Sequence, residues 1–482
     1  MRDYEFYYTQ DGSVGLYSYK DDDVFHSKYG AITEAWQKFV LPSGINELLN
    51  TKQTIKVLDV CYGVGYNTKA LMSYVIFSDE EKLKLKNKKF LKFKTKNFLK
   101  NFGNFLKKDI NIETIDNHNM KYNLAKLLLS IETEEADIIS KISIDCLDID
   151  NNLIKISPLL KTMSTPQEIY TKIVPKIFEC YDSYWKLMKF ISKIYYKLSR
   201  GNSKRITDKL NLKYSNDYDE PNKAYTIHKF VNIILADRLL DKYDNNYYSE
   251  SLKNFIKRKE NRRYIDKHIV KYLDLKSKIR YNFMSKINLL TNLHNIYYDY
   301  QSKRYKNAKY DQVEKLFDLN FYAEDARKSI LKLDGQYDLI FLDAFTYTKA
   351  PELWTSEFIA ELYARLSSRG YLLTYSNSAL VRNTLLENNF YIGKIIDEKT
   401  GNSIGTIAAK DKSLIKNLLT NYELGLCGTK AGIPYHDYGL SSPREVILKR
   451  RENDFKNSDL LTSSQYMKRR LHKSEETEDE QE

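Results

Sequence analysis

Short apolar runs, several of which end in an aspartate, recur along the chain and predict buried strands of a parallel sheet. The stretches at 355–366 and 378–388 have helical spacing and separate the later runs. Strands that alternate with helices indicate an α/β fold with an open, mostly parallel sheet. The runs expected to form these strands cover residues 55–60, 142–150, 319–325, 337–345 and 370–376.

Two other regions have the pattern of β-hairpins. Residues 4–20 alternate between apolar and polar positions around the turn signal DGS at 11–13, which predicts a hairpin near the N-terminus. The runs 390–396 and 403–409 predict a second hairpin near the other end of the sheet. Between the N-terminal hairpin and the first buried run, residues 34–49 have helical spacing.

Long polar stretches separate these elements and divide the chain into core segments and insertions. We expect a hairpin and helix in the first segment, two parts of one α/β core, two basic insertions of which the second is helical, and a charged, disordered tail. The hairpin and helix cover 1–50. The first part of the core covers 51–76 and 141–160, with the basic insertion 77–140 between them. The helical basic insertion covers 161–315, the second part of the core 316–452 and the tail 453–482.

The charge of the chain lies in two of these stretches. The 482 residues include 77 Lys and Arg against 64 Asp and Glu, a formal net charge of +13. Residues 81–110 carry +9 and residues 251–310 carry +12, so the remainder is net −8. Concentrated positive charge favours a polyanion such as nucleic acid as a partner, although lysine-rich faces exposed only to solvent are the alternative.

Several protein classes are disfavoured by what the sequence lacks. Its four cysteines form no C-x-x-C pair, so neither a disulfide framework nor a cysteine-based zinc site is expected. It has no apolar window long enough to span a membrane, and its first residues do not have the pattern of a secretory leader. We therefore expect a reduced, cytoplasmic protein without a metal or a membrane partner.

A glycine loop follows the first buried run. Gly63 and Gly65 lie in CYGVGYN, where small residues allow the backbone to approach a ligand. The dinucleotide motif G-x-G-x-x-G is not completed, because residue 68 is Thr, and no G-x-x-x-x-G-K-[ST] motif occurs. A ligand with adenine, ribose and a positive centre but no phosphate fits better, and S-adenosylmethionine has this chemistry. A glycine turn of no functional importance remains the alternative.

Acidic side chains follow several of the predicted strands. Because the carboxyl ends of parallel strands meet at one edge of a sheet, where ligands bind, these acids are expected to lie close together. They are Asp59, the pair Asp148 and Asp150, Asp325 and Asp343.

A family resemblance is carried by the segments VFHSKYGAITEAWQKFV (24–40), VLDVCYGVGYNT (57–68), DLIFLDAFTYTKAPELWTSEF (338–358), YLLTYSNSALVRNTLLENNFYIG (371–393) and AGIPYHDYGLSSPREVILKRRE (431–452). These segments resemble the S-adenosylmethionine-dependent methyltransferases similar to the methyltransferase half of the bifunctional tRNA 5-methylaminomethyl-2-thiouridine biosynthesis protein. The resemblance covers 4–76, 142–155 and 319–452 in that order. It implies a Rossmann-like, seven-stranded class I methyltransferase with an N-terminal β-hairpin and a long helical insertion.

The resemblance also implies roles for single residues in binding S-adenosylmethionine. Asp148 is expected to hold the ribose hydroxyls, with Asp116 as its rival, and Asp325 to accept a hydrogen bond from the adenine amine. The residues expected around the methionine moiety are Asp59, Gly63, Gly65 and Asn67. His26, Ser27, Tyr29 and Glu34 are candidates to close over the cofactor.

A second set of residues is expected to bind the methyl acceptor. Asp343 is the candidate for hydrogen bonding to, or removing a proton from, the reacting amine, with capping of its strand as the alternative. Phe345 and Trp354 are candidates for stacking on the acceptor base, and core packing is their alternative. Arg382 either meets a substrate phosphate or pairs with an acid on its own helix.

The activity implied is methylation of the aminomethyl group on the modified wobble uridine of tRNA, which converts 5-aminomethyl-2-thiouridine to 5-methylaminomethyl-2-thiouridine. No segment resembles the FAD-dependent oxidase half, so only this final step is expected. Two alternatives remain. An aminopropyltransferase of the spermidine synthase kind is disfavoured, because CYGVGYN and DAFTYTKAP depart from that family's glycine loop and D-x-x-D-P segment. The other is a non-catalytic RNA-binding protein on a methyltransferase scaffold.

Overall fold

A computed structural model describes the core segments of the chain and part of the second insertion. The basic insertion 77–140 and the rival Asp116 lie outside the described residues, as do most of 161–315, the segment 26–29 and the end 471–482. The described residues are 4–11, 13–20, 22–25, 30–75, 141–161, 221–243, 247, 250–267, 269–270, 273, 317–398 and 400–470.

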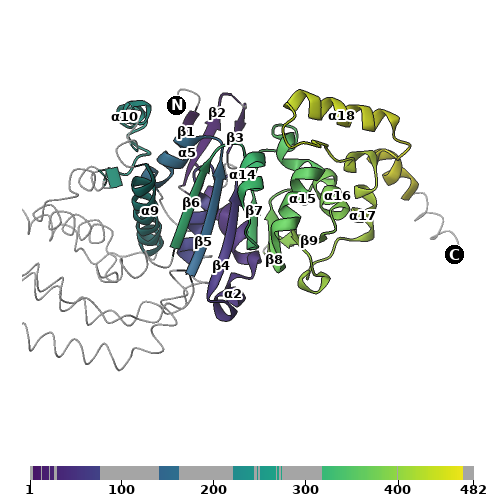
Figure 1. Ribbon diagram of the computed structural model, residues 1–482, viewed down its shortest axis with the longest axis horizontal. Coiled ribbons are helices and arrows are strands. Elements are labelled where there is room, and N and C mark those ends of the chain that lie inside the picture. The colour runs from purple at the N-terminus through teal and green to yellow at the C-terminus, as the bar shows by residue number, and fades with distance from the viewer. Residues whose placement is uncertain are drawn as a thin grey trace, which may run out of the picture.

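A seven-stranded sheet forms the centre of the molecule (Figure 1). Its strand order is β6-β5-β4-β7-β8-β10-β9, and all neighbours pair in parallel except at β10, which is antiparallel to both β8 and β9. This order confirms the predicted Rossmann-like methyltransferase fold, including the hairpin of its last two strands. The strands are β4 (Thr54–Val60), β5 (Lys141–Asp148), β6 (Phe317–Ala323), β7 (Tyr337–Leu342), β8 (Leu366–Thr374), β9 (Tyr391–Ile396) and β10 (Ser403–Ala409).

The N-terminal hairpin is present and gains a third strand. β1 (Tyr4–Tyr8), β2 (Val14–Ser18) and β3 (Asp23–Val24) form an antiparallel sheet beside the carboxyl ends of β4 and β5 (Figure 1). The Asp11 carboxylate in its turn accepts hydrogen bonds from the backbone N–H and the hydroxyl of Thr33, at 2.9 and 2.8 Å. The hairpin is therefore tied to the helical segment that follows it.

That helical segment, predicted as continuous from 34 to 49, is divided into four pieces. Pro42, which has no backbone N–H, and Gly44, with φ of 67°, interrupt the helical hydrogen bonds. The apolar side chains Trp36, Phe39 and Val40 of this stretch are buried. The pieces are α1 (Ala31–Glu34), the π-helical η1 (Ala35–Val40), the 3₁₀ turn η2 (Leu41–Ser43) and α2 (Ile45–Thr51).

Helices cover both faces of the sheet and one of its edges. A long helix of the second insertion, α9 (Pro221–Tyr243), lies beside the edge strand β6 (Figure 1). Its Arg238 donates to the Phe317 carbonyl at 3.2 Å, and its Lys242 donates to the carbonyl of Phe321. Part of the insertion thus covers an edge that could otherwise pair with another strand.

The remaining helices lie mainly beside β7, β8 and β9, and the tail begins as a helix. α18 (Arg444–Asn457) continues into the predicted tail, and residues 463–470 are also helical. The Tyr466 ring stacks on Tyr422, which fixes this part of the tail against α17. The other elements are α5 (Asn151–Ile156), η3 (Ser157–Leu159), α10 (Glu250–Lys257), α14 (Ala326–Lys332), η6 (Pro351–Trp354), α15 (Ser356–Arg365), α16 (Ala379–Glu387), η7 (Lys412–Leu414), α17 (Asn421–Cys427) and η8 (Lys430–Gly432).

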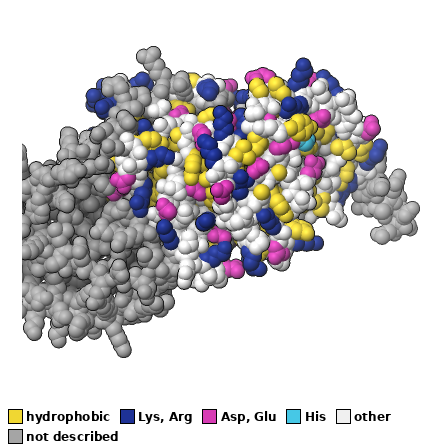
Figure 2. Space-filling view, viewed as in Figure 1, with side chains coloured by type: hydrophobic (Ala, Val, Ile, Leu, Met, Phe, Trp, Pro, Cys, Tyr) yellow, Lys and Arg dark blue, Asp and Glu magenta, His cyan; other side chains and the backbone are white. Residues whose placement is uncertain are grey.

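The surface of the described residues mixes charge of both signs. On the face drawn in Figure 2, Lys and Arg side chains alternate with Asp and Glu and do not gather in one patch. Among the described residues, no helix is long and apolar enough to cross a membrane.

Candidate active site

The glycine loop that follows β4 has a backbone that few side chains would tolerate. Cys61, Gly63 and Gly65 have φ values of 66°, 56° and 75°, all in the left-handed region. A Cβ at Gly65 would collide with the Tyr62 ring, whose hydroxyl is fixed at 2.9 Å from Ser157 Oγ. The turn therefore requires glycine at 65, and it brings backbone N–H groups to the carboxyl edge of the sheet.

Asp148, the last residue of β5, lies against this loop. Its Oδ2 accepts a 2.6 Å hydrogen bond from the backbone N–H of Gly63, although the two residues are 85 positions apart. Its Oδ1 accepts from the N–H of Asp150 at 2.8 Å. Burial raises the pKa of Asp148 to about 6, despite these two hydrogen bonds. The acid predicted to hold a ribose is therefore brought to the glycine loop.

Asp150 has other partners. It caps α5 by accepting from the N–H of Asn152 at 2.8 Å, and it accepts from the Tyr4 hydroxyl at 2.6 Å. The second contact joins β1 of the small sheet to the end of β5. Asp150 thus connects the two sheets, and Asp148 is the carboxylate next to the loop.

Asp59 lies fully buried beneath the loop with only part of its hydrogen-bonding capacity used. Its Oδ2 accepts from the Thr68 hydroxyl at 2.6 Å. Its Oδ1 has no hydrogen-bond partner among the described residues. Burial raises the pKa of Asp59 to about 7, and the charges of Asp343 and Asp148 contribute to the increase. A cationic ligand would relieve this crowding of carboxylates.

Asp343 follows β7 and lies on the other side of the loop. Its N–H donates to the Val60 carbonyl at 3.2 Å, so the loop after β7 continues the pairing with β4. The side-chain amide of Asn67 donates to Asp343 Oδ2 at 2.8 Å. Burial raises the pKa of Asp343 to about 6, with a further increase from Glu34. Asn67 and Asp343, both predicted site residues, are therefore in direct contact.

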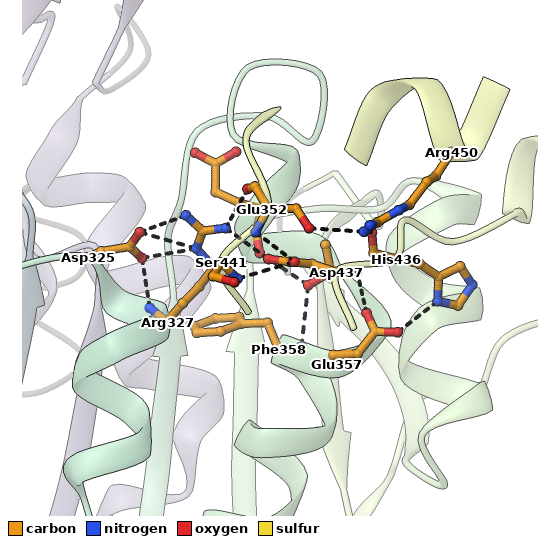
Figure 3. Close-up of polar contacts among 11 residues, drawn as sticks. Asp325, Arg327, Glu352, Glu357, Phe358, His436, Asp437, Ser441 and Arg450 are labelled. Carbon is orange, nitrogen blue, oxygen red and sulfur yellow. Dashed lines mark hydrogen bonds and ion pairs between the residues drawn. The ribbon is translucent and has the colours of Figure 1, made fainter. Parts of the chain in front are cut away.

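Asp325 is held by an arginine two residues further along the chain. It caps α14 through the backbone N–H of Arg327 at 2.9 Å, and it forms an ion pair with Arg327 Nη2 at 2.7 Å (Figure 3). Burial alone would raise the pKa of Asp325, but the hydrogen bonds and charge of Arg327 outweigh it and hold the pKa below its usual value. A ligand at this carboxylate would share it with the guanidinium.

An aromatic pair lies at the glycine loop. Phe345 is half-buried, and its ring meets Phe25 edge to face with centroids 4.9 Å apart. Phe25 also lies over Gly63, where a Cβ would be 3.5 Å from its ring. Phe25 was not predicted as a site residue. Its position in VFHSKYG, one of the segments that carry the family resemblance, was the available signal.

The other two predicted substrate residues are in packed positions. Trp354 is 1% exposed and donates its indole N–H to the Phe345 carbonyl at 2.8 Å. Arg382 is buried, and its guanidinium donates to Thr406 Oγ1 at 3.1 Å and to Asn377 Oδ1 at 3.0 Å. For Trp354 this is the packing alternative. Arg382 also forms an ion pair with Glu423 of α17 at 3.3 Å, an acid on another helix and not on its own. Glu34 pairs with Lys38 at 2.9 Å.

The residues present fit S-adenosylmethionine. A glycine loop presents a backbone N–H beside Asp148, and a buried carboxylate oxygen of Asp59 is free of partners among the described residues. This set suits a ribose and a cation, and it offers no cradle for a pyrophosphate. Among the described residues there is no group of three His, Cys, Asp or Glu side chains that could hold a metal ion.

Comparisons with known proteins agree with this chemistry. Residues 288–410, which include Asp325 and Asp343, match the family model described as S-adenosyl-L-methionine-dependent methyltransferase. Uncharacterized protein MJ0670 of Methanocaldococcus jannaschii is 30% identical over 180 residues, 37% of this chain and 44% of that protein. The tRNA 5-methylaminomethyl-2-thiouridine biosynthesis bifunctional protein MnmC of Pseudomonas putida F1 is 40% identical over 78 residues, 16% of this chain and 12% of that protein.

The chain thus matches less than half the length of either relative. A solved structure, MNMC2 from Aquifex aeolicus, has a TM-score of 0.46 at 17% identity over 94% of this chain and 86% of its own, a likeness too weak to bear on function. The strand order, the site and the family match agree with one another. The chain therefore carries an S-adenosyl-L-methionine-dependent methyltransferase domain, and S-adenosylmethionine is its cofactor.

Proposed function

We propose that this protein methylates the exocyclic aminomethyl group of a modified wobble uridine in tRNA, converting 5-aminomethyl-2-thiouridine to 5-methylaminomethyl-2-thiouridine. The observation that carries the proposal is the 2.8 Å contact between Asn67 and Asp343, which holds a carboxylate beside the glycine loop. The name of the bifunctional MnmC relatives supports the choice of tRNA. The reaction would take place in the cytoplasm, where tRNA is modified.

Four acids divide the work of binding the cofactor in this proposal. Asp148 would accept hydrogen bonds from the ribose diol, since the Gly63 N–H keeps its carboxylate in place. Asp59 would face the positively charged end of the cofactor, and Asp325, held by Arg327, would face the adenine. When bound, S-adenosylmethionine supplies a methyl group activated by its sulfonium.

Asp343 would position the methyl acceptor. An alkylamine is mostly protonated at neutral pH and reacts only as the free base, so the site must hold the amine and take up a proton. A carboxylate whose pKa is about 6 is largely ionised at neutral pH and can accept a hydrogen bond from the amine. Because Asn67 occupies Oδ2, the other oxygen of Asp343 is the one offered to the amine.

The aromatic pair and the basic segments would hold the rest of the tRNA. Phe345, supported by Phe25, would form a wall for the base, and Trp354 would fix that wall from behind through the Phe345 carbonyl. Arg382 would support β10 from its buried position. The lysine-rich segments 81–110 and 251–310 would supply the phosphate contacts.

The test uses the purified protein, S-adenosylmethionine and tRNA from cells that lack the final methylation step. Nucleosides are then separated and identified by mass spectrometry. Conversion of the aminomethyl nucleoside to the methylaminomethyl form by the wild type, and not by Asp343→Asn, is the expected result. An unchanged nucleoside profile with the wild type would overturn the proposal, and transfer of an aminopropyl group from decarboxylated S-adenosylmethionine would identify the aminopropyltransferase alternative.

A further inference from the structure

A tyrosine between η8 and α18 is exposed and yet held in place. Tyr438 is 74% exposed, and its ring stacks on His436 with centroids 5.5 Å apart and an angle of 13°. The Arg450 guanidinium lies 5.3 Å from the centroid of the same ring. The stacked imidazole and the cation together hold this exposed ring in place.

The neighbours of Tyr438 are themselves fixed by hydrogen bonds. Glu357 accepts from the Asp437 N–H at 2.7 Å and lies 2.9 Å from His436 Nδ1. Arg450 donates to the His436 carbonyl at 3.3 Å and to Ser442 Oγ at 3.0 Å. Figure 3 shows the pair of Glu357 and His436 at one end of this network, with Arg450 above it. A surface fixed in this way loses little conformational entropy on binding.

The same network joins Tyr438 to the rim of the active site. Asp437 accepts from Arg327 Nη1 at 2.8 Å, and Arg327 also holds Asp325 (Figure 3). Further along, Arg444 donates at 2.7 Å to the carbonyl of Thr348, in the loop that follows Asp343. Tyr438 therefore lies between Asp437 and Arg444 in the chain, and the contacts of these two residues reach Arg327 and the loop that follows Asp343.

The segment that follows Tyr438 along the chain has a positive net charge. Residues 443–470 contain eight Lys or Arg and four Asp or Glu. Lys449 and the run 468–470 are exposed. Exposed aromatic rings beside positive charge are the combination that binds unpaired nucleotides, because bases stack on the ring while the cations meet phosphates.

We propose that His436, Tyr438 and Arg450 form a stacking platform for an unpaired RNA base outside the reaction centre, with Tyr438 as the contact ring. The proposal rests on the proposed function, because it places a second nucleotide of the same tRNA substrate on the platform. The platform would add affinity and help to orient the tRNA without touching the cofactor or the reacting amine.

The test measures binding of a fluorescein-labelled anticodon stem-loop RNA to the full-length protein by anisotropy at several salt concentrations. Tyr438→Ala should weaken binding about tenfold, because it removes one base stack, and Tyr438→Trp should keep the affinity of the wild type. The slope of affinity against salt should not change in Tyr438→Ala, since no charge is lost. Tyr391→Ala, which removes a ring that is 46% exposed on β9, serves as the matched control.

The outcomes separate the platform from the proposed function. If Tyr438→Ala binds the stem-loop as tightly as the wild type while the wild type methylates tRNA, the platform is wrong and the proposed function stands. If the wild type neither binds the RNA nor methylates tRNA, both are wrong. If Tyr438→Ala binds the RNA as tightly as the wild type but no longer binds a protein partner, the platform is also wrong. That result would identify the patch as a protein-binding surface.

Discussion

Asn67, just after the glycine loop, donates a 2.8 Å hydrogen bond to the carboxylate of Asp343, 276 residues further along the chain. The contact joins the segment that follows β4 to the segment that follows β7. It fixes one oxygen of the carboxylate and leaves the other for an acceptor. In the proposed function this geometry gives the two acids different roles, with Asp148 binding the cofactor and Asp343 the acceptor.

Asp343→Asn is predicted to abolish turnover while cofactor binding remains. The substitution keeps the shape of the side chain but removes the negative charge that holds the amine, so kcat should fall by about 10²–10⁴-fold. Calorimetric titration with S-adenosylmethionine should give the Kd of the wild type. Asp334→Asn, which changes an exposed carboxylate, is the control and should match the wild type in both measurements. An equal loss of rate and of cofactor affinity would show that Asp343 is a cofactor ligand.

Binding of S-adenosylmethionine is predicted to weaken as the pH falls, first below about 7 as Asp59 takes up a proton and further below about 6 as Asp148 does. The free-enzyme pKa of Asp148 is raised to about 6, and only its ionised form can accept two hydrogen bonds from a diol. Below that pH the group must lose a proton to bind, so Kd should rise about tenfold per pH unit until the pKa of the complex is reached.

Asp148→Asn tests this assignment. It should bind the cofactor weakly at all pH values and lose the dependence attributed to Asp148, whereas Asp343→Asn should retain it. The readout is Kd from calorimetry between pH 5 and about 8, a range that brackets the raised pKa. If Asp148→Asn keeps the full slope, the titrating group is another acid, and Asp59 is the next candidate.

The meeting of Asp59, Asp148 and Asp343 could be predicted from the sequence for a simple geometric reason. Each follows or ends an apolar run, and the carboxyl ends of parallel strands share one edge. The packing of Trp354 could not be predicted in the same way. Its burial depends on the loop after β7 folding back so that the indole N–H reaches the Phe345 carbonyl, and no local spacing encodes that contact.

Two other features also depend on contacts distant in sequence. Arg327 lies two residues after Asp325, a spacing common to many helix starts, and its second partner Asp437 is 110 residues further on. The approach of Phe25 to Gly63 depends on how the small sheet docks on the large one. Helical spacing from 34 to 49 was recognised, but the division of that stretch at Gly44 follows from its positive φ.

Gly65→Ala is predicted to damage the cofactor site, and the chain offers a matched control. At Gly65 the φ of 75° would strain an alanine, and its Cβ would also collide with the Tyr62 ring. Gly401 has a similar φ of 70°, but a Cβ there would meet open space. Gly401→Ala should therefore cost only about 1–2 kcal/mol of stability from its backbone conformation. Gly65→Ala should lower Tm further and weaken cofactor binding, as measured by thermal unfolding and calorimetry. Equal effects of the two variants would contradict the required close approach at Gly65.

The stability of the protein is predicted to depend on pH through Lys69, which is fully buried in the helix after the glycine loop. Its Nζ donates to the Ser157 carbonyl at 2.7 Å, and burial lowers its pKa from 10.5 to about 7. Above a pH of about 7 the folded state holds a neutral lysine, while the unfolded chain keeps the proton up to about 10.5. The unfolded state then binds more protons, so the contribution of Lys69 to the free energy of unfolding rises with pH across this window and is lowest below it.

Lys69→Met, which keeps an unbranched apolar side chain one atom shorter and removes the titrating group, should remove this rise. Urea unfolding of both proteins at pH 7 and at about pH 9.5 provides the measurement, with the difference between the proteins as the readout, because it cancels the titration of other groups. The free energy of unfolding of Lys69→Met minus that of the wild type should be larger at pH 7 than at the higher pH, by an amount on the order of a few kcal/mol. Parallel pH profiles would mean that the ammonium stays charged in the folded state, and the hydrogen bond to Ser157 would then be a charged one.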